Sequence, residues 1–244
     1  MPLCNTCECH QKLDFKIKMA FQPIVNVEEK SVFAYEALVR GENGEGAGYI
    51  FDKVTEANKY SFDQACRVTA IQTIAKLDPT AHVSINFLPN AIYDPETCLA
   101  RTLASAEKYG FPRENIIFEV TEHEKIENQA LLRDVFATYK AKGFRTAIDD
   151  FGEGFAGLNL LAKFQPDFLK LDMNLIQGIN NDKVKQSILS GIQTTASSLN
   201  VELIAEGIED KDDFLFLKYN KIKYMQGFFF AKPELEGLPT INWD

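Results

Sequence analysis

The chain has 244 residues, of which 45% are hydrophobic and 25% charged, and its formal net charge is −9. This composition provides enough apolar residues for a folded core, and the acidic balance opposes binding to polymeric nucleic acid and to anionic membranes. No apolar run approaches the length of a bilayer span and the N-terminus lacks the apolar segment of a signal peptide, so we expect a soluble, cytoplasmic protein without a membrane partner.

Residues 1–15 are predicted to form a tail outside a single folded domain of residues 16–244. Three cysteines and a histidine lie close together in this tail: Cys4, Cys7, Cys9 and His10. Their spacing suits zinc or another soft metal, but no second pair of such ligands follows, so a tail without a metal is the simpler interpretation. Cys66 and Cys98 fall in helical patterns and are predicted to be packing residues.

The first two predicted strands are close neighbours in the sequence. They cover about Lys16–Phe21 and Val32–Val39, with a turn near residues 28–30, and this short separation favours an antiparallel pair. A glycine-containing loop follows over Gly41–Gly48. From Ile50 to about Leu77, apolar residues recur at helical spacing and predict one or two helices.

From Val83 onward, predicted strands and helices alternate. The strands are expected at residues 83–87, 115–120, 146–149, 168–171 and 201–205, with a last strand ending near 225–226. The helices are expected at residues 100–109, 124–142, 158–162, 183–199 and 210–219, and Gly110, Gly143 and Asn200 stand where left-handed C-terminal caps are expected. Alternating elements specify a parallel sheet, and eight strands in all indicate a single (β/α)8 TIM-like barrel. An open doubly wound sheet is the alternative, although no glycine-rich dinucleotide fingerprint follows an early strand.

Polar side chains recur in or just beyond these apolar strands. The set is Glu36, Asn86, Glu119, Glu122, Asp149, Asp150, Lys170, Glu206 and Gln226. Each has a structural explanation by itself, such as a satisfied hydrogen bond or, for the adjacent Asp149 and Asp150, a helix cap. Their recurrence on strand after strand predicts a site at the carboxyl ends of the strands, where active sites of barrels gather.

The predicted convergence of carboxylates has an electrostatic consequence. In a low dielectric these acids would repel one another, and several would have to be protonated unless cations bind them. Two divalent ions would resolve the repulsion, and such a pair, about 3.5–4 Å apart, can activate water and hold a phosphodiester for in-line attack. Lys170 could neutralise developing charge or orient the nucleophile. The residues therefore indicate metal-assisted hydrolysis of a phosphate ester.

An ordered set of motifs runs along the chain: Gln22-Pro23-Ile24, Glu36-Ala37-Leu38-Val39-Arg40, Ser84-Ile85-Asn86, Glu119-Val120-Thr121-Glu122, Asp149-Asp150-Phe151-Gly152, Leu169-Lys170-Leu171-Asp172, Ala205-Glu206-Gly207-Ile208-Glu209 and Gln226-Gly227. This set resembles that of EAL domains, the phosphodiesterases of cyclic di-GMP. The resemblance covers about Phe21 to Pro233 and implies a (β/α)8-like barrel with an antiparallel first strand. Gly41 stands where the family often has Trp, and the altered loop Glu153–Leu158 resembles that of EAL domains joined to blue-light (BLUF) sensors.

The resemblance also implies roles for individual residues. Glu36, Asn86, Glu119 and Asp149 would hold one Mg²⁺ or Mn²⁺ ion, with Asp149 and Asp150 serving a second. Lys170 and Glu206 would position and deprotonate the attacking water, and Glu122 would steady the loop after Asp150. The implied contacts to the dinucleotide are Gln22, Arg40, Gln226 and Glu209.

The activity implied by the resemblance is hydrolysis of cyclic di-GMP to linear pGpG, and a homodimer is a further expectation from the family. One alternative is a non-catalytic receptor that binds the dinucleotide and signals to a protein partner. Another is a metal-dependent barrel enzyme that acts on a different phosphodiester. Because every implied metal ligand is present in the sequence, hydrolysis of cyclic di-GMP is favoured over these two alternatives.

Overall fold

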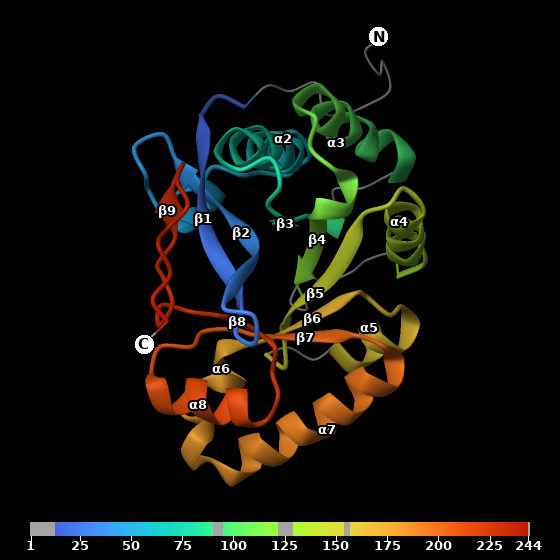
Figure 1. Cartoon of the computed structure of the whole chain (residues 1–244). Helices are drawn as coiled ribbons and strands as arrows, with labels where there is room; N and C mark the ends of the chain where they lie inside the picture. Colours follow the sequence, from blue (N-terminus) through green and yellow to red (C-terminus); the bar gives the residue numbers. More distant parts are fainter. Residues whose placement is uncertain (1–12, 90–94, 122–128, 154–156, 244) are drawn as a thin grey trace.

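The computed structural model describes residues 13–89, 95–121, 129–153 and 157–243 (Figure 1). The predicted cysteine–histidine group at residues 4–10 lies outside the described residues, as does Glu122. None of the described helices is both long and apolar enough to cross a membrane.

Eight strands form a closed barrel. They are β1 (Ile17–Asn26), β2 (Ser31–Gly41), β3 (Val83–Asn86), β4 (Ile116–Thr121), β5 (Arg145–Phe151), β6 (Phe168–Leu171), β7 (Glu202–Ala205) and β8 (Tyr224–Gln226). Strands β2 to β8 run parallel in chain order, and β1 closes the barrel by antiparallel pairing with both β2 and β8. The predicted (β/α)8 barrel with an antiparallel first strand is confirmed. A short strand that was not predicted, β9 (Glu234–Leu235), pairs with β1 beside β8.

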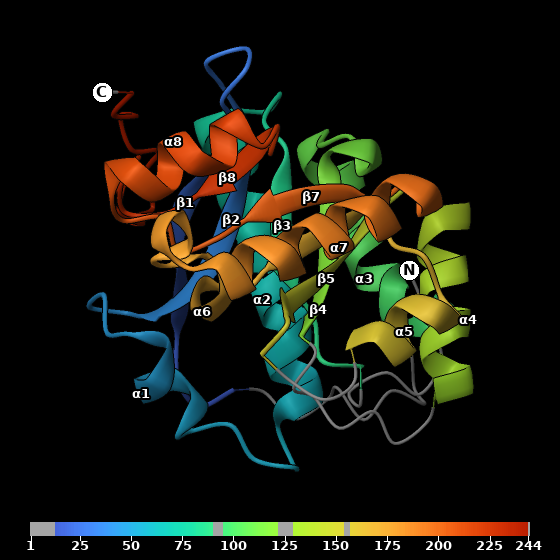
Figure 2. The same ribbon diagram turned by 90° about the horizontal axis from the view of Figure 1, so that it is seen from below.

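Helices cover the outside of the barrel (Figures 1 and 2). They are α1 (Ala47–Phe51), α2 (Lys59–Leu77), α3 (Pro95–Tyr109), α4 (Gln129–Ala141), α5 (Gly157–Lys163), α6 (Met173–Ile176), α7 (Lys183–Leu199) and α8 (Lys211–Tyr219). The prediction for α7 is confirmed at both ends: Asp182 accepts hydrogen bonds from two amides of the first turn, and Asn200 ends the helix with φ of 55°. The predicted caps Gly110 and Gly143 also have positive φ.

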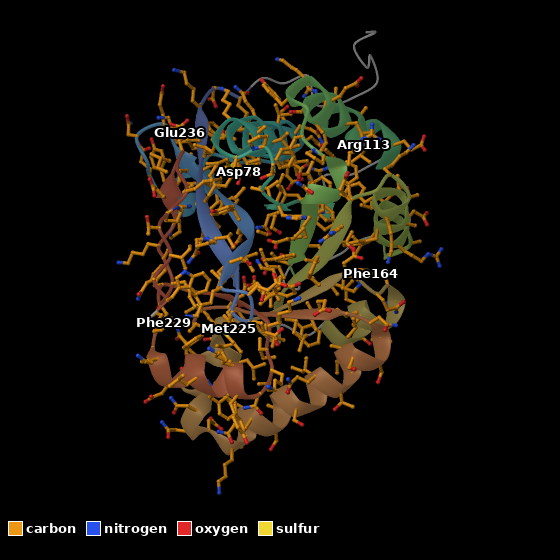
Figure 3. All side chains as sticks on the ribbon, in the orientation of Figure 1. Asp78, Arg113, Phe164, Met225, Phe229 and Glu236 are labelled. Carbon is orange, nitrogen blue, oxygen red and sulfur yellow. The ribbon has the colours of Figure 1, made fainter. Side chains whose placement is uncertain are left out.

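Two apolar layers stabilise the barrel. One fills its interior and forms a floor of alternate strand residues: Ile24, Ala34, Ile117, Ala147, Phe168, Ile204 and Tyr224. The other fills the space between the strands and the helices, and Phe164 and Met225, which are labelled in Figure 3, are among its buried members. Because successive side chains of a strand point to opposite faces, every strand of the barrel except β3 contributes to both layers.

A buried cation connects α2 to the rest of the helical layer. Arg67 is fully buried, and its guanidinium lies 2.8 Å from the Asp63 carboxylate and donates a 2.8 Å hydrogen bond to the Tyr139 hydroxyl of α4. Asp63 also accepts a hydrogen bond of 3.0 Å from the amide of Leu88, which follows β3. The guanidinium carbon lies 5.2 Å from the centre of the Phe118 ring, a distance at which a cation is attracted by the ring.

Replacing this cation is expected to destabilise the fold. Arg67→Met should lower the free energy of unfolding by about 3–5 kcal/mol, because the substitution leaves the buried Asp63 carboxylate without a counter-charge. Urea unfolding followed by circular dichroism measures this. Arg133→Met removes a guanidinium that is 67% exposed and serves as the control. A loss below about 1 kcal/mol for Arg67→Met would show that the buried pair contributes little.

Candidate active site

A polar layer lies inside the barrel directly above the apolar floor. On six strands, a polar residue follows a floor residue at an interval of two: Ala34 and Glu36, Ile117 and Glu119, Ala147 and Asp149, Phe168 and Lys170, Ile204 and Glu206, Tyr224 and Gln226. On β1, which runs in the opposite direction, Gln22 precedes Ile24 by the same interval. Residues two apart on a strand share a face, so the strand pattern that builds the floor also gathers the polar side chains.

The pairing register then brings these side chains next to one another around the barrel. Gln22 is paired with Glu36 across β1 and β2, and Asn86 with Glu119 across β3 and β4. Gln226 donates a hydrogen bond of 2.6 Å to the Glu36 carboxylate and one of 3.2 Å to the Gln22 side-chain oxygen. The polar side chains at the strand ends therefore converge at one end of the barrel.

Lys170 occupies the centre of this layer and is fully buried. Its ammonium nitrogen lies 2.9 Å from an oxygen of Asp149, 2.9 Å from Glu206, 3.0 Å from Glu119 and 3.6 Å from Glu36. One ammonium group thus faces four carboxylates. It can balance only one of their charges when all four are ionised.

A bulge in β5 turns two adjacent aspartates toward the site. Between the paired positions Ile148–Leu169 and Phe151–Leu171, Asp149 and Asp150 stand opposite Lys170 alone. Asp150 has φ of 54°, a left-handed conformation that a regular strand does not contain, and its amide donates a 3.0 Å hydrogen bond to the Asp149 carboxylate. The prediction that this strand ends at residue 149 was wrong: it continues to Phe151, and the bulge keeps the two carboxylates from pointing to opposite faces.

The carboxylates form groups with the spacing of metal ligands. Oxygens of Glu36, Glu119 and Asp149 lie within 4.8 Å of one another, as do oxygens of Asp149, Asp150 and Glu206. Asp149 belongs to both groups, which suits a pair of cations that share one carboxylate. Hard oxygen donors of this kind fit Mg²⁺ or Mn²⁺.

Asn86 lies at the edge of the first group. Its amide nitrogen is 3.4 Å from Glu36 and 3.5 Å from Glu119, so its side-chain amide is in place to complete a ligand set of mixed carboxylate and amide oxygens. A third group, Asp150, Glu153 and Asp172, adjoins the second through Asp150. Neither Glu153 nor Asp172 was predicted as a site residue.

Ser84 is a further site residue that sequence reasoning missed. It is fully buried, and its hydroxyl donates a hydrogen bond to the Glu119 carboxylate. A signal was available, because Ser84 lies two residues before Asn86 on the same strand and therefore shares its face. By holding one oxygen of Glu119, Ser84 leaves the other free to face Lys170 and the rest of the acidic layer.

A cleft of about 310 Å³ opens above the acidic layer. Asp150, Lys170 and Glu206 line it together with the exposed residues Glu209 and Phe228. A second cavity of about 340 Å³ has mostly apolar walls that include Asn86, and Asp149 lines both spaces. A ligand in either space can therefore reach the carboxylates.

Three of the four predicted dinucleotide contacts, Gln22, Gln226 and Glu209, line the cleft. Arg40 does not line either cavity: it is half-buried and donates a 2.8 Å hydrogen bond to the Val39 carbonyl. Tyr35 directly precedes Glu36, so its side chain lies on the opposite face of β2, where it packs against the outer apolar layer. Cys98 is buried in that layer and Cys66 packs against it, as predicted.

Burial and mutual repulsion change the acid–base properties of the layer. Burial, opposed by Lys170 and reinforced by Asp149 and Glu36, raises the pKa of Glu119 to about 8. Burial and the neighbouring Asp149 raise the pKa of Asp150 to about 6, and burial holds the pKa of Glu206 well above its ordinary range. Burial lowers the pKa of Lys170, but the surrounding carboxylates outweigh it and raise that pKa well above its usual value. Without a divalent cation, the layer therefore retains protons near neutral pH.

These pKa shifts predict how metal binding and stability depend on pH. The carboxyl of Glu119 has a pKa of about 8 in the fold, against 4.5 as the ordinary value for the unfolded chain, so the metal-free fold loses stability as the pH rises through this interval. Because Mn²⁺ must displace these protons, its affinity should rise over the same interval. Thermal unfolding in chelator and in saturating Mn²⁺ should show a metal-induced increase in Tm that grows from about pH 6 to about pH 8. An increase of equal size throughout would contradict these shifts.

Comparison with known proteins identifies relatives over nearly the whole chain. Residues 9–233 match the family model of the EAL domain. The chain is 30% identical to the blue light- and temperature-regulated antirepressor BluF of Escherichia coli, covering 92% of this chain and 56% of that protein. It is also 30% identical to the probable cyclic di-GMP phosphodiesterase PdeG of the same organism, covering 87% and 44%. The chain thus spans about half the length of these curated relatives, and the match to BluF agrees with the resemblance to EAL domains joined to blue-light sensors.

Solved structures of EAL proteins are also similar to this chain over most of its length. A standalone versatile EAL protein from Vibrio cholerae, in its c-di-GMP-bound form, is 52% identical with a TM-score of 0.92, covering 95% of this chain and 98% of that chain. BlrP1 of Klebsiella pneumoniae, in a complex with manganese and cyclic di-GMP, is 31% identical with a TM-score of 0.88, covering 95% and 59%. The fold is therefore common to this chain and to these proteins.

Proposed function

This chain belongs to the EAL domain family, and on that basis we propose that it hydrolyses cyclic di-GMP to linear pGpG. The observation that carries the proposal is the shared position of Asp149 in two carboxylate groups at the base of an open cleft. The relatives support it, since one is named a probable cyclic di-GMP phosphodiesterase and a solved structure holds manganese together with the dinucleotide.

The residues present fit two divalent cations, Mg²⁺ or Mn²⁺. Glu36, Asn86, Glu119 and Asp149 would hold one ion, and Asp149 and Asp150 the other. When bound, the ions would supply Lewis acidity toward the phosphodiester and offset the negative charge of the layer. All of the donors are oxygen atoms of carboxylates and one amide, which is the ligand chemistry that these ions prefer.

Glu206 is the proposed general base. Its carboxylate lies at the base of the cleft with 13% of the side chain exposed, 2.9 Å from the Lys170 ammonium that positions it. A carboxylate whose pKa is raised toward the working pH accepts a proton more effectively than an ordinary one. Glu206 would take a proton from the attacking water as the oxygen bonds to phosphorus. The bond from phosphorus to the leaving ribose oxygen then breaks, that oxygen takes up a proton, and the ring opens to the linear dinucleotide.

Other residues would hold the substrate. Gln22 and Gln226 offer amide groups at the wall of the cleft beside Glu36. Arg40 would have to exchange the Val39 carbonyl for a phosphate oxygen in order to make the contact that the resemblance implies. Glu122, outside the described residues, would steady the loop that follows Asp150.

Incubation with cyclic di-GMP and Mg²⁺ or Mn²⁺, followed by chromatographic separation of the nucleotides, tests the function. We expect conversion to pGpG, and none in chelator. Intact substrate after long incubation, with binding still measured by calorimetry, would select the non-catalytic receptor.

Light scattering after size exclusion would test whether the protein forms the expected homodimer. Limited proteolysis would test the expected boundary between the tail and the domain of residues 16–244.

A substitution at Glu36 tests the ligand assignment. Glu36→Ala is expected to weaken Mn²⁺ binding by at least about tenfold, because the first carboxylate group loses one of its members. Calorimetric titration with Mn²⁺ measures the change, and Glu42→Ala, an exposed acid close in sequence, is the matched control. A Glu36→Ala variant that binds Mn²⁺ as the parent does would remove Glu36 from the ligand set.

A further inference from the structure

A buried aspartate outside the acidic layer holds the chain next to one of the proposed metal ligands. Asp63 lies on α2 and is 3% exposed, and its carboxylate accepts the 3.0 Å hydrogen bond from the Leu88 amide. Leu88 stands two residues after Asn86, and all three line the apolar-walled cavity of about 340 Å³. Asp63 is not a member of the three carboxylate groups with the spacing of metal ligands. It therefore contacts the site through the chain beside a ligand and not as a ligand.

The two residues after Asn86 belong to no helix or strand. The Phe87 amide donates a 3.0 Å hydrogen bond to the Glu119 carbonyl, which extends the pairing with β4 by one residue. The next amide, that of Leu88, donates instead to the side chain of Asp63 on α2. The path of the chain as it leaves β3 is thus set at Leu88 by a buried carboxylate and no longer by a neighbouring strand.

Arg67 fixes both of the residues that follow Asn86. Its guanidinium lies 2.8 Å from the Asp63 oxygen that does not accept from Leu88, so the carboxylate is held from two sides. The guanidinium carbon also lies 5.5 Å from the centre of the Phe87 ring, within the range of a cation–ring attraction. Because these groups are buried and contact one another, the position of this segment is coupled to that of α2.

Asn86 depends on such support because its own side chain has only long contacts in the acidic layer. Its amide nitrogen is 3.4 Å from Glu36 and 3.5 Å from Glu119, longer than an ordinary hydrogen bond. A ligand contributes fully only when its donor atom is held within about 0.5 Å of the productive position. Freedom of the backbone at Leu88, two residues away, would therefore reduce what Asn86 adds to metal binding.

We propose that Asp63 is a positioning residue: by holding the Leu88 amide, it fixes the end of β3 so that the Asn86 side chain is in place for the first cation. This inference rests on the proposed function and adds a residue outside the barrel strands on which that ion depends. The second ion, against Asp149 and Asp150, takes no ligand from β3 and should depend on Asp63 much less. Loss of such a supporting contact typically weakens metal binding by about 10- to 100-fold.

Two double variants that differ in a single hydrogen-bond acceptor test this proposal. Replacing Asp63 alone would leave Arg67 buried without a counter-charge, so both variants also carry Arg67→Met. Asp63→Asn/Arg67→Met keeps an oxygen for the Leu88 amide, whereas Asp63→Leu/Arg67→Met has a side chain of similar shape without one. In calorimetric titration with Mn²⁺, the first variant should keep both parental affinities to within about threefold, and the second should lose about tenfold or more at one ion alone. Circular dichroism at the titration temperature verifies that both are folded.

Asn86→Ala shows whether the effect passes through Asn86. By itself it should weaken binding of the same ion. Added to Asp63→Leu/Arg67→Met it should cause little further loss, because the support of that ligand is already gone, whereas added to Asp63→Asn/Arg67→Met it should cause its full loss. Asp134→Leu, at an aspartate that is 64% exposed on α4, is the control. Full losses in both backgrounds would show that Asp63 does not act through Asn86.

Equal Mn²⁺ affinities in the two double variants would overturn the inference, even where their Tm values differ, and would leave the proposed hydrolysis untouched. Equal weakening of both ions in Asp63→Leu/Arg67→Met would overturn it as well, because a general loss of structure does not distinguish one ion from the other. A parent protein that binds two Mn²⁺ ions without cleaving cyclic di-GMP would remove the proposed function, and the same titrations would decide the inference. A parent that binds no Mn²⁺ would overturn both.

Discussion

Glu206→Gln is expected to lower kcat for cyclic di-GMP by about 10²- to 10⁴-fold while changing the dissociation constant of the dinucleotide by less than about threefold. Glutamine keeps the size of the side chain but cannot accept the proton of the attacking water. The ion pairs of Lys170 with Asp149 and Glu119, at 2.9 and 3.0 Å, do not involve Glu206 and should persist. Binding and chemistry should therefore separate in this variant.

Steady-state kinetics and calorimetric titration with Mn²⁺ present measure the two quantities. Glu202→Gln is the matched control, because Glu202 is exposed at the start of β7, the strand that Glu206 follows, and does not line the cleft. Equal losses of binding and of rate in Glu206→Gln would mean that Glu206 holds the substrate or the metal and is not the base.

Lys170→Met is expected to have a large effect on stability that depends on metal. In chelator, near pH 8, the variant should lose about 3–5 kcal/mol of unfolding free energy, because the four surrounding carboxylates lose the only ammonium group that contacts them among the described residues. Saturating Mn²⁺ should restore part of this loss by replacing the missing positive charge. The rate of hydrolysis should stay low even with Mn²⁺, because Glu206 has lost the group that positions it.

Urea unfolding in chelator and in Mn²⁺ tests this expectation. Lys140→Met, which removes a lysine that is 65% exposed and 3.8 Å from Asp167, should change stability by less than about 1 kcal/mol. A Lys170→Met variant as stable as the parent in chelator would show that the carboxylates are already neutralised by protons and that Lys170 is not their main counter-charge.

Much of the barrel and of the acidic layer could be predicted because successive side chains of a strand alternate between its two faces. Glu119 and Lys170 could be placed on the inner face because each stands between apolar residues of a short strand. The strand Phe168–Leu171 and the helix Lys183–Leu199 agree with prediction at both ends, since strong local signals define them. The early antiparallel pair was predictable because its connection is too short for a crossover.

The features that sequence did not predict depend on tertiary structure. The bulge at Asp149 and Asp150 arises from two-against-one pairing with β6, which no local pattern encodes. The pattern of residues 50–77 predicted one or two helices without choosing between them. The fold has two, because the Asn58 side chain accepts a hydrogen bond from the Thr55 amide and donates one to the Lys53 carbonyl, which closes a turn between α1 and α2. Strand β9 and helix α6, of two and four residues, are too short to show a period.

The central claim, that the acidic layer seats two divalent ions sharing Asp149, is tested most directly by diffraction from crystals grown with Mn²⁺, recorded at the manganese absorption edge. Two anomalous peaks about 3.5–4 Å apart are predicted, one against Glu36, Asn86, Glu119 and Asp149 and the other against Asp149 and Asp150. A map without peaks at these carboxylates, in which the Lys170 ammonium keeps its contacts with them, would contradict the claim.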